Sequence, residues 1–135
     1  MTKLWLKIPA VLYSLVIFLL SSIPQENVIR VDIWNFDKVE HLFEYGIFGI
    51  FLMLAFVNFR SEKVARNAVW ISLVIGILYA GTDEIHQLYV PGRLCSMYDL
   101  IADMIGIALG AYYFTKSKWI ARMSSRLENS RQFPG

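Results

Sequence analysis

Cysteine, charged residues and net charge are all scarce in this chain of 135 residues. The single cysteine, Cys95, has no partner for an internal disulfide, which excludes a disulfide-stabilised scaffold. Charged residues make up 18% of the chain, below the roughly 25% of a typical soluble domain. The formal net charge of +2 is too small to indicate a nucleic-acid partner. Together these shortages exclude a disordered chain and an ordinary soluble enzyme.

Long apolar stretches are abundant instead. Hydrophobic residues account for 56% of the chain, and the mean hydropathy is +0.47. A transmembrane helix needs about 20 mostly apolar residues, and four stretches fit: 4–22, 38–58, 66–89 and 97–115. The connections between them are too short for a soluble domain. The sequence therefore predicts an all-α integral membrane protein, with one four-helix transmembrane bundle over residues 1–115 and a basic tail over residues 116–135.

Lysine and arginine are distributed unevenly around these stretches. Ten of the thirteen lie at the start of the first stretch, from the end of the second to the start of the third, or after the fourth: Lys3, Lys7, Arg60, Lys63, Arg66, Lys116, Lys118, Arg122, Arg126 and Arg131. Because such residues are retained on the cytoplasmic side, both termini are predicted to be cytoplasmic, in a multi-pass protein of the plasma membrane. The connections at 23–37 and 90–96 then face outward. The tail either lies on anionic headgroups, with Trp119 at the interface, or is solvated.

Polar side chains inside a membrane are costly and often functional. Three of the four stretches carry them as stripes at helical spacing: Asp37, His41 and Glu44; Asp83 and His86; and Asp99 and Asp103. Glu44, Asp83 and Asp103 each lie six residues, or roughly 9 Å, inside the outer helix end. The stripes are therefore predicted to meet in one layer of the outer leaflet, open to the extracytoplasmic space. Glu84 and Gln87 adjoin the third stripe and are expected to face other sectors of their helix.

This layer has an excess of negative charge. The five acidic residues of the stripes contribute −5, while Lys38 and Arg93 return +2. The remainder requires protons, water or a bound cation in a low-dielectric pocket. A mixed set of histidine and carboxylate groups suits a divalent metal such as zinc or manganese, and it also suits acid–base catalysis. The candidate catalytic residues are His41, Glu44, Asp83, His86, Asp99 and Asp103, of which all but Asp99 are candidate metal ligands. A purely structural polar network is the alternative.

Other features have competing interpretations. Arg93, in the turn that contains Pro91 and Gly92, either binds an anionic group or pairs with Asp83 or Asp99. Ser96 precedes Asp99 by three residues, as in a capping box. Gly106 and Gly110 are spaced for close helix packing within the bundle, and a homodimer through them is a further option.

Four separated segments carry a more specific pattern: S-S-I-P-Q (21–25), D-K-V-E-H-L-F-E-Y-G-I-F-G (37–49), T-D-E-I-H-Q-L-Y-V-P-G-R (82–93) and S-M-Y-D-L-I-A-D-M-I-G-I-A-L-G (96–110). In this order they resemble the VanZ-like family of bacterial membrane proteins. The resemblance implies a small four-helix membrane bundle and, through the family's namesake, low-level resistance to the glycopeptide teicoplanin. It also implies functional positions beyond the catalytic candidates, here taken as substrate-binding: Asp37, Lys38, Glu84, Gln87, Arg93 and Ser96.

Three functions are compatible with this pattern. The first is a metal-dependent or acid–base hydrolase or transferase that acts on an envelope or lipid-linked molecule, with Lys38 and Arg93 holding an anionic headgroup. The second is a binding protein that shields a lipid or cell-wall precursor without chemistry. The third, a small transporter or flippase, is the least favoured because the inner halves of the four stretches carry almost no charge.

Overall fold

The computed structural model describes residues 4–27 and 36–132, with side chains for residues 4–27 and 37–118. Of the residues used to predict the orientation and the placement of the tail, Lys3 lies outside these ranges, as do the side chains of Trp119, Arg122, Arg126 and Arg131. The regular structure of the described ranges is helical, without strands. Its elements are η1 (Leu4–Lys7), α1 (Ile8–Ser21), η2 (Gln25–Asn27), α2 (Phe36–Val57), α3 (Glu62–Arg66), α4 (Ala68–Gln87) and α5 (Met97–Gln132).

Three segments of the described chain are long and apolar enough to cross a membrane: Leu4–Ser21, Asp37–Val57 and Ala68–Gln87. They correspond to the first three predicted stretches. The protein is therefore an all-helical protein with helices suited to a membrane. The fourth predicted stretch begins where α5 begins, at Met97, but the helix continues past Thr115 to Gln132.

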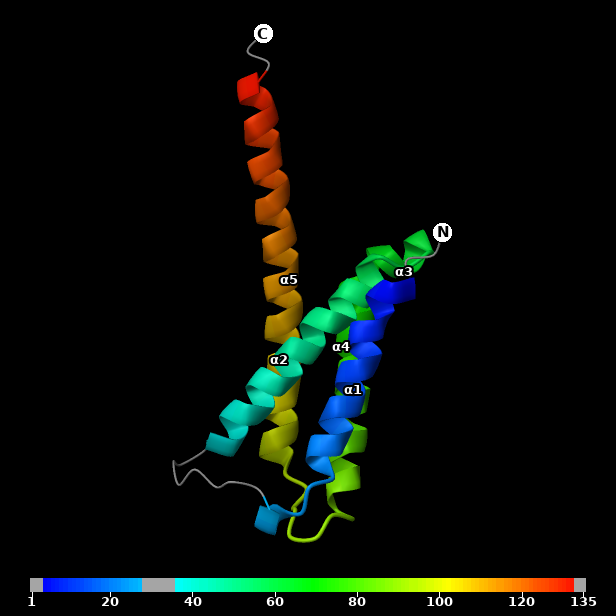
Figure 1. Ribbon diagram of the computed structural model, residues 1–135, viewed down its shortest axis with the longest axis vertical. Coiled ribbons are helices and arrows are strands. Elements are labelled where there is room, and N and C mark those ends of the chain that lie inside the picture. The colour runs from blue at the N-terminus through cyan, green and yellow to red at the C-terminus, as the bar shows by residue number, and fades with distance from the viewer. Residues whose placement is uncertain (1–3, 28–35, 133–135) are drawn as a thin grey trace.

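Helix α2 lies at the centre of the bundle and packs against α5, α4 and α1. It crosses in front of α5, while α1 runs beside α4 (Figure 1). The main core joins all four long helices through residues such as Ile17, Phe48, Ala80 and Ile107. The start of η1 and the end of α5 point toward the α3 end of the bundle, and η2 and the α4–α5 connection lie at the opposite end (Figure 1).

Glycines bring α2 and α5 into backbone contact. A Cβ on Gly106 would lie 2.5 Å from the Leu42 carbonyl oxygen, and one on Gly49 would lie 2.6 Å from that of Ile107. A Cβ on Gly110 would overlap the backbone of Gly46. This confirms that Gly106 and Gly110 serve close packing within the bundle, so a homodimer through these two glycines would have to displace α2. The same contact sets the spacing between the polar residues of α2 and α5.

Candidate functional site

The polar residues gather at the end of the bundle that holds the α4–α5 connection, in two groups. The His41 cluster joins α2, α4 and α5 and consists of Lys38, His41, Glu84, Asp99 and Asp103. The His86 cluster joins α1 and α4 and consists of Ser21, Ser22, Asp83, His86 and Gln87. The single layer expected from the sequence is thus divided, and each half contains one histidine and one deeply placed aspartate.

In the first cluster, a buried carboxylate holds the imidazole of His41. His41 Nδ1 lies 2.9 Å from Asp103 Oδ1, and the Asp103 side chain is fully buried. The second carboxylate oxygen, Oδ2, has no hydrogen-bond partner in the described part of the chain. A carboxylate at one ring nitrogen fixes the ring's orientation and leaves the other nitrogen, Nε2, for a further interaction.

Glu84 and Asp99 complete this arrangement around His41. One ring nitrogen of His41 and one carboxylate oxygen from each acid all lie within 4.8 Å of one another. Glu84 Oε2 accepts a hydrogen bond of 2.8 Å from the backbone N–H of Ser96, whereas its buried Oε1 has no partner within the described residues. Helices α2, α4 and α5 thus bring one nitrogen and two oxygen atoms close together.

Lys38 supplies the positive charge of the His41 cluster. Its ammonium group pairs with Asp99 and, at 2.5 Å, with Asp37. Because two carboxylates hold it, Lys38 does not stand free for an anionic headgroup in this conformation. Asp37 neutralises Lys38 at the helix start, so both predicted substrate-binding residues are engaged with each other here.

In the His86 cluster, hydrogen bonds fasten the end of α1 to α4. Asp83 Oδ2 accepts bonds from Ser21 Oγ (2.8 Å) and Gln87 Nε2 (3.2 Å). Ser22 Oγ lies 3.0 Å from His86 Nε2 and 2.6 Å from the Phe18 carbonyl oxygen. Since the hydroxyl donates its one proton to that carbonyl, His86 Nε2 is the donor to Ser22. Asp83 and His86, both predicted as catalytic and metal-binding, therefore lie in a helix-joining network.

Arg93 also contacts the end of α1. Its guanidinium donates from Nε to the Ile23 carbonyl (3.2 Å) and from Nη2 to the Leu20 carbonyl (3.3 Å). A cation at the carboxyl end of a helix is favourable because it meets the negative pole of the helix dipole. Neither predicted ion pair, with Asp83 or with Asp99, forms among the described residues.

A hollow of about 560 Å³ lies between the two clusters, and we term it the polar hollow. Its polar lining consists of Tyr13, Ser21, Asn27, Glu40, His41, Glu44, Gln87 and Arg93. Glu44 Oε1 is buried in its wall without a partner in the described chain. The hollow is therefore lined by a glutamate that keeps one buried oxygen without a hydrogen bond and by a carboxylate-bound histidine, and its volume suits a small polar headgroup.

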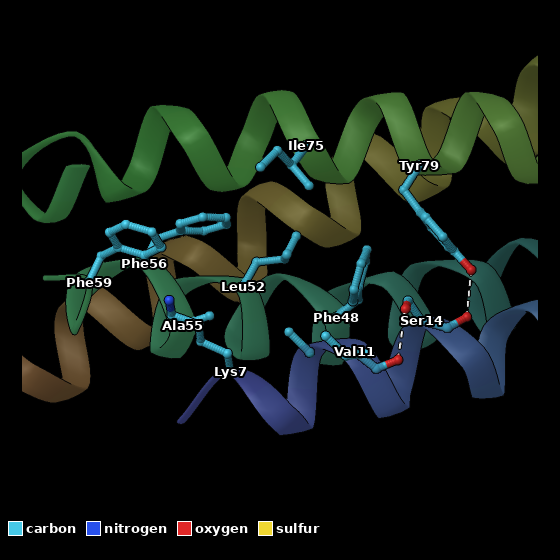
Figure 2. A pocket seen from close by; sticks show the side chains of 11 residues that line it. Lys7, Val11, Ser14, Phe48, Leu52, Ala55, Phe56, Phe59, Ile75 and Tyr79 are labelled. Atoms are coloured by element: carbon cyan, nitrogen blue, oxygen red, sulfur yellow. Dashed lines mark hydrogen bonds between the residues drawn. The ribbon is translucent and has the colours of Figure 1, made fainter. Parts of the chain in front are cut away.

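A second hollow, nearer the α3 end, differs in chemistry. It measures about 290 Å³ and is lined mainly by aliphatic and aromatic side chains from α1, α2 and α4, including Val11, Phe48 and Leu52 (Figure 2). Lys7 is its one charged lining residue. Tyr79 bonds to the Ser14 backbone carbonyl at its edge (Figure 2). This hollow offers no carboxylate or histidine for catalysis or for ion passage.

The sequence-based prediction places Glu84 and Gln87 wrongly and omits two serines. Both residues are predicted to face other sectors of their helix, but Glu84 is 2% exposed and meets His41 and Asp99, and Gln87 is buried and donates to Asp83. The residues Ala68, Ser72, Gly76 and Ala80 form a buried stripe at four-residue spacing, and Glu84 is its next member. That pattern in the sequence could have predicted the burial of Glu84. The two serines, Ser21 and Ser22, follow one another at the end of an apolar helix, which is a weaker indication of their role.

The predicted capping role of Ser96 is partly confirmed. Ser96 Oγ accepts a long hydrogen bond of 3.4 Å from the Asp99 N–H, as in a helix cap. The reciprocal bond of a capping box goes elsewhere, because the Ser96 N–H donates to Glu84 instead of Asp99. The start of α5 is thereby fixed against α4, and this contact positions both acids around His41.

Comparison with known proteins adds one positive finding. The family model described as VanZ/LLP1 matches residues 4–121, which covers α1, α2, α4 and the first part of α5. No curated protein and no solved structure matches the chain. Because the match spans nearly all of the described helices, the chain belongs to the VanZ/LLP1 family.

Proposed function

We propose that this protein crosses the plasma membrane four times and acts at its outer leaflet on an envelope or lipid-linked molecule, by hydrolysis or group transfer. The observation that carries the proposal is the polar hollow, where the unpartnered carboxylate of Glu44 lies beside His41 and its partner Asp103. Buried polar groups without partners are rare in stable proteins and concentrate at functional sites.

The first part of α5 serves as the fourth span in this proposal. It packs along α2 through its glycine face, and it exposes apolar side chains such as Ile101, Ile105 and Leu109. An outward apolar face suits lipid, whereas Asp99 and Asp103 are buried on the inward side. Residues after Thr115 would continue into the cytoplasm as the basic tail.

Each residue's proposed role matches its hydrogen bonds. Glu44 accepts a proton from the attacking water or hydroxyl group, while the oxygen of that water or hydroxyl group bonds to the reacting phosphorus or carbonyl carbon. The bond to the leaving oxygen breaks, and Glu44 returns that proton to the leaving oxygen, so that charge and atoms balance. His41 stabilises the negative charge that develops on the reacting group, while Asp103 is its positioning residue. Arg93 lines the hollow and attracts an anionic headgroup.

Turnover of a defined lipid tests this proposal. Purified protein is mixed with phosphatidylcholine vesicles containing, in turn, a polyprenyl diphosphate, a polyprenyl-linked saccharide and phosphatidylglycerol. Mass spectrometry follows the products. We expect one substrate to be converted by the wild type and, at least 100-fold more slowly, by Glu44→Gln. Equal rates for the two proteins would contradict the proposal, and saturable binding without product would establish the shielding function instead.

Teicoplanin resistance is proposed as the cellular consequence of this activity. Expression in a susceptible bacterium should raise the inhibitory concentration of teicoplanin, and Glu44→Gln should abolish the rise at equal protein abundance. Transport remains disfavoured, since Lys7 is the one charged residue that lines the hollow toward the α3 end. If expression of the wild-type protein left the inhibitory concentration unchanged, this chain would not share the resistance role of the family's namesake.

The orientation has a direct test in the chain's one cysteine. Cys95 is exposed in the α4–α5 connection, which is proposed to face outward. A membrane-impermeant maleimide should label it in intact cells. Partial desolvation and the Glu84 carboxylate raise the pKa of the Cys95 thiol, so mildly alkaline pH provides more of the reactive thiolate. In a Cys95→Ser background, Ser117→Cys should react only after permeabilisation, and the reverse pattern would overturn the orientation.

A further inference from the structure

We infer that the His41 cluster is a binding site for one divalent transition-metal ion such as Zn²⁺ or Mn²⁺, with His41, Glu84 and Asp99 as its ligands. This inference deepens the proposed function, because it names what provides positive charge at His41. The binding itself is measured without any substrate. The ligand set differs from the sequence expectation, which has Glu44, Asp83, His86 and Asp103 as ligands beside His41 and does not include Glu84 or Asp99.

The geometry of the three groups supports a shared ion. Their ligand atoms lie within 4.8 Å of one another. Nitrogen and oxygen ligands stand about 2.0–2.2 Å from a zinc ion, which separates neighbouring ligands by roughly 3–4 Å. Small side-chain rotations would close the difference. One imidazole and two carboxylates leave a coordination position open, as catalytic sites require.

The surroundings of the three groups supply independent support. Glu84 is 2% exposed, and its Oε1 atom has no partner in the described chain, so a buried acceptor is left without a donor. Asp103 contacts His41 Nδ1 at 2.9 Å, which is the usual placement of a carboxylate behind a metal-bound histidine. The ring nitrogen away from Asp103 is then available to the ion.

The charge of the cluster also favours a cation. Three carboxylates, from Glu84, Asp99 and Asp103, surround His41 in a largely buried setting. Lys38 pairs with Asp99, but its one positive charge is shared with Asp37. A divalent ion would neutralise two of the negative charges that remain, and it would compete with the Lys38 ammonium for Asp99. When bound, such an ion polarises a phosphoryl or carbonyl oxygen as a Lewis acid.

The two histidines make a matched test. The full chain is purified in detergent with a chelator, and Zn²⁺ or Mn²⁺ binding is measured by calorimetry and elemental analysis. We expect about one ion per wild-type chain. His41→Ala and Glu84→Gln should each weaken binding at least 100-fold, and Asp103→Asn should weaken it roughly 10–100-fold. His86→Ala, in the other cluster, should bind as the wild type does.

Lys38→Met sharpens the test because it removes the competing ammonium and leaves the three ligands in place. It should strengthen metal binding severalfold, which a merely structural role for Lys38 would not produce. Thermal unfolding of each metal-free variant checks that it is folded. Asp99→Asn, which also removes a ligand, replaces His41→Ala or Glu84→Gln if either is unfolded. Absence of stoichiometric binding by the wild type, or equal loss in His86→Ala and His41→Ala, would overturn the inference.

The outcomes also separate this inference from the proposed function. If no metal binds but Glu44→Gln still abolishes turnover, His41 acts directly and only the metal site is wrong. If the metal binds to the wild type and Glu44→Gln turns over substrate normally, the metal site stands and the proposed role of Glu44 fails.

Discussion

His41 and His86 are the two histidines of the chain, and their surroundings differ in kind. The His86 ring donates to the Ser22 hydroxyl and stacks on Phe18 with ring centroids 4.6 Å apart. The His41 ring contacts the buried Asp103, next to two further acids. One histidine sits among groups that complete each other's hydrogen bonds, and the other sits among acids whose bonding capacity is unused.

The difference distinguishes a network of completed hydrogen bonds from the cluster for which we propose reactivity. In the His86 cluster, no side-chain oxygen or nitrogen is buried without a partner within the described residues. In and around the His41 cluster, Glu44, Glu84 and Asp103 each leave one buried oxygen without a hydrogen bond. Because such groups cost stability, their retention favours a functional role. Sharing one polar layer is therefore not enough to assign one role.

The largest expected effect on stability comes from separating α2 and α5, the helices that carry His41 and Asp103. Gly106→Ala places a Cβ 2.5 Å from the Leu42 carbonyl oxygen and 3.0 Å from the Gly46 nitrogen, so α2 and α5 must separate. We expect a loss of about 1–3 kcal/mol in the free energy of unfolding. Gly81→Ala is the control, because nothing lies within 4 Å of its Cβ and alanine favours helix. Detergent unfolding curves measure both, and equal values would contradict the close-packing account.

A pair of substitutions with opposite signs sharpens the contrast between the clusters. Ser21→Ala removes the 2.8 Å donor to buried Asp83 and should destabilise the protein by about 1–2 kcal/mol. Glu44→Met removes a partly buried, unpartnered carboxylate and should stabilise it by on the order of 1 kcal/mol, while abolishing turnover. Unfolding curves of the two variants beside the wild type provide the measurement. Destabilisation by Glu44→Met would mean that Glu44 has a structural role.

The smallest expected effect concerns the link between α1 and His86. Ser22→Ala deletes the 3.0 Å contact with His86 Nε2 and should cost roughly 0.6 kcal/mol, as is typical of hydrogen bonds between membrane helices. Metal affinity, measured by calorimetry, should remain within twofold of the wild type. If Ser22→Ala changed the metal affinity by much more than twofold, the His86 cluster would influence the His41 cluster, and the distinction between them would fail.

The sequence predicted the helices better than the contacts. Periodicity and apolar length located α1, α2 and α4, and they located the start of α5, because these signals are local. The pairing of His41 with Asp103, and of His86 with Ser22, depends on which helix faces lie together, and stripe positions do not specify that. Glu84 illustrates the limit. The sequence-based prediction assigns the polar face of the helix to Asp83, whereas the stripe of small residues that leads to Glu84 indicates the buried face.

The central claim is the proposed contrast between His41 as a metal ligand and His86 as a structural residue, and nuclear magnetic resonance of the two imidazoles tests it most directly. With ¹⁵N-labelled histidine, the chain gives ring signals from two residues, which His86→Ala assigns. Addition of one equivalent of Zn²⁺ should shift the ring nitrogens of His41 strongly and leave those of His86 in place. Equal shifts for the two rings, or no shift for His41, would contradict the claim.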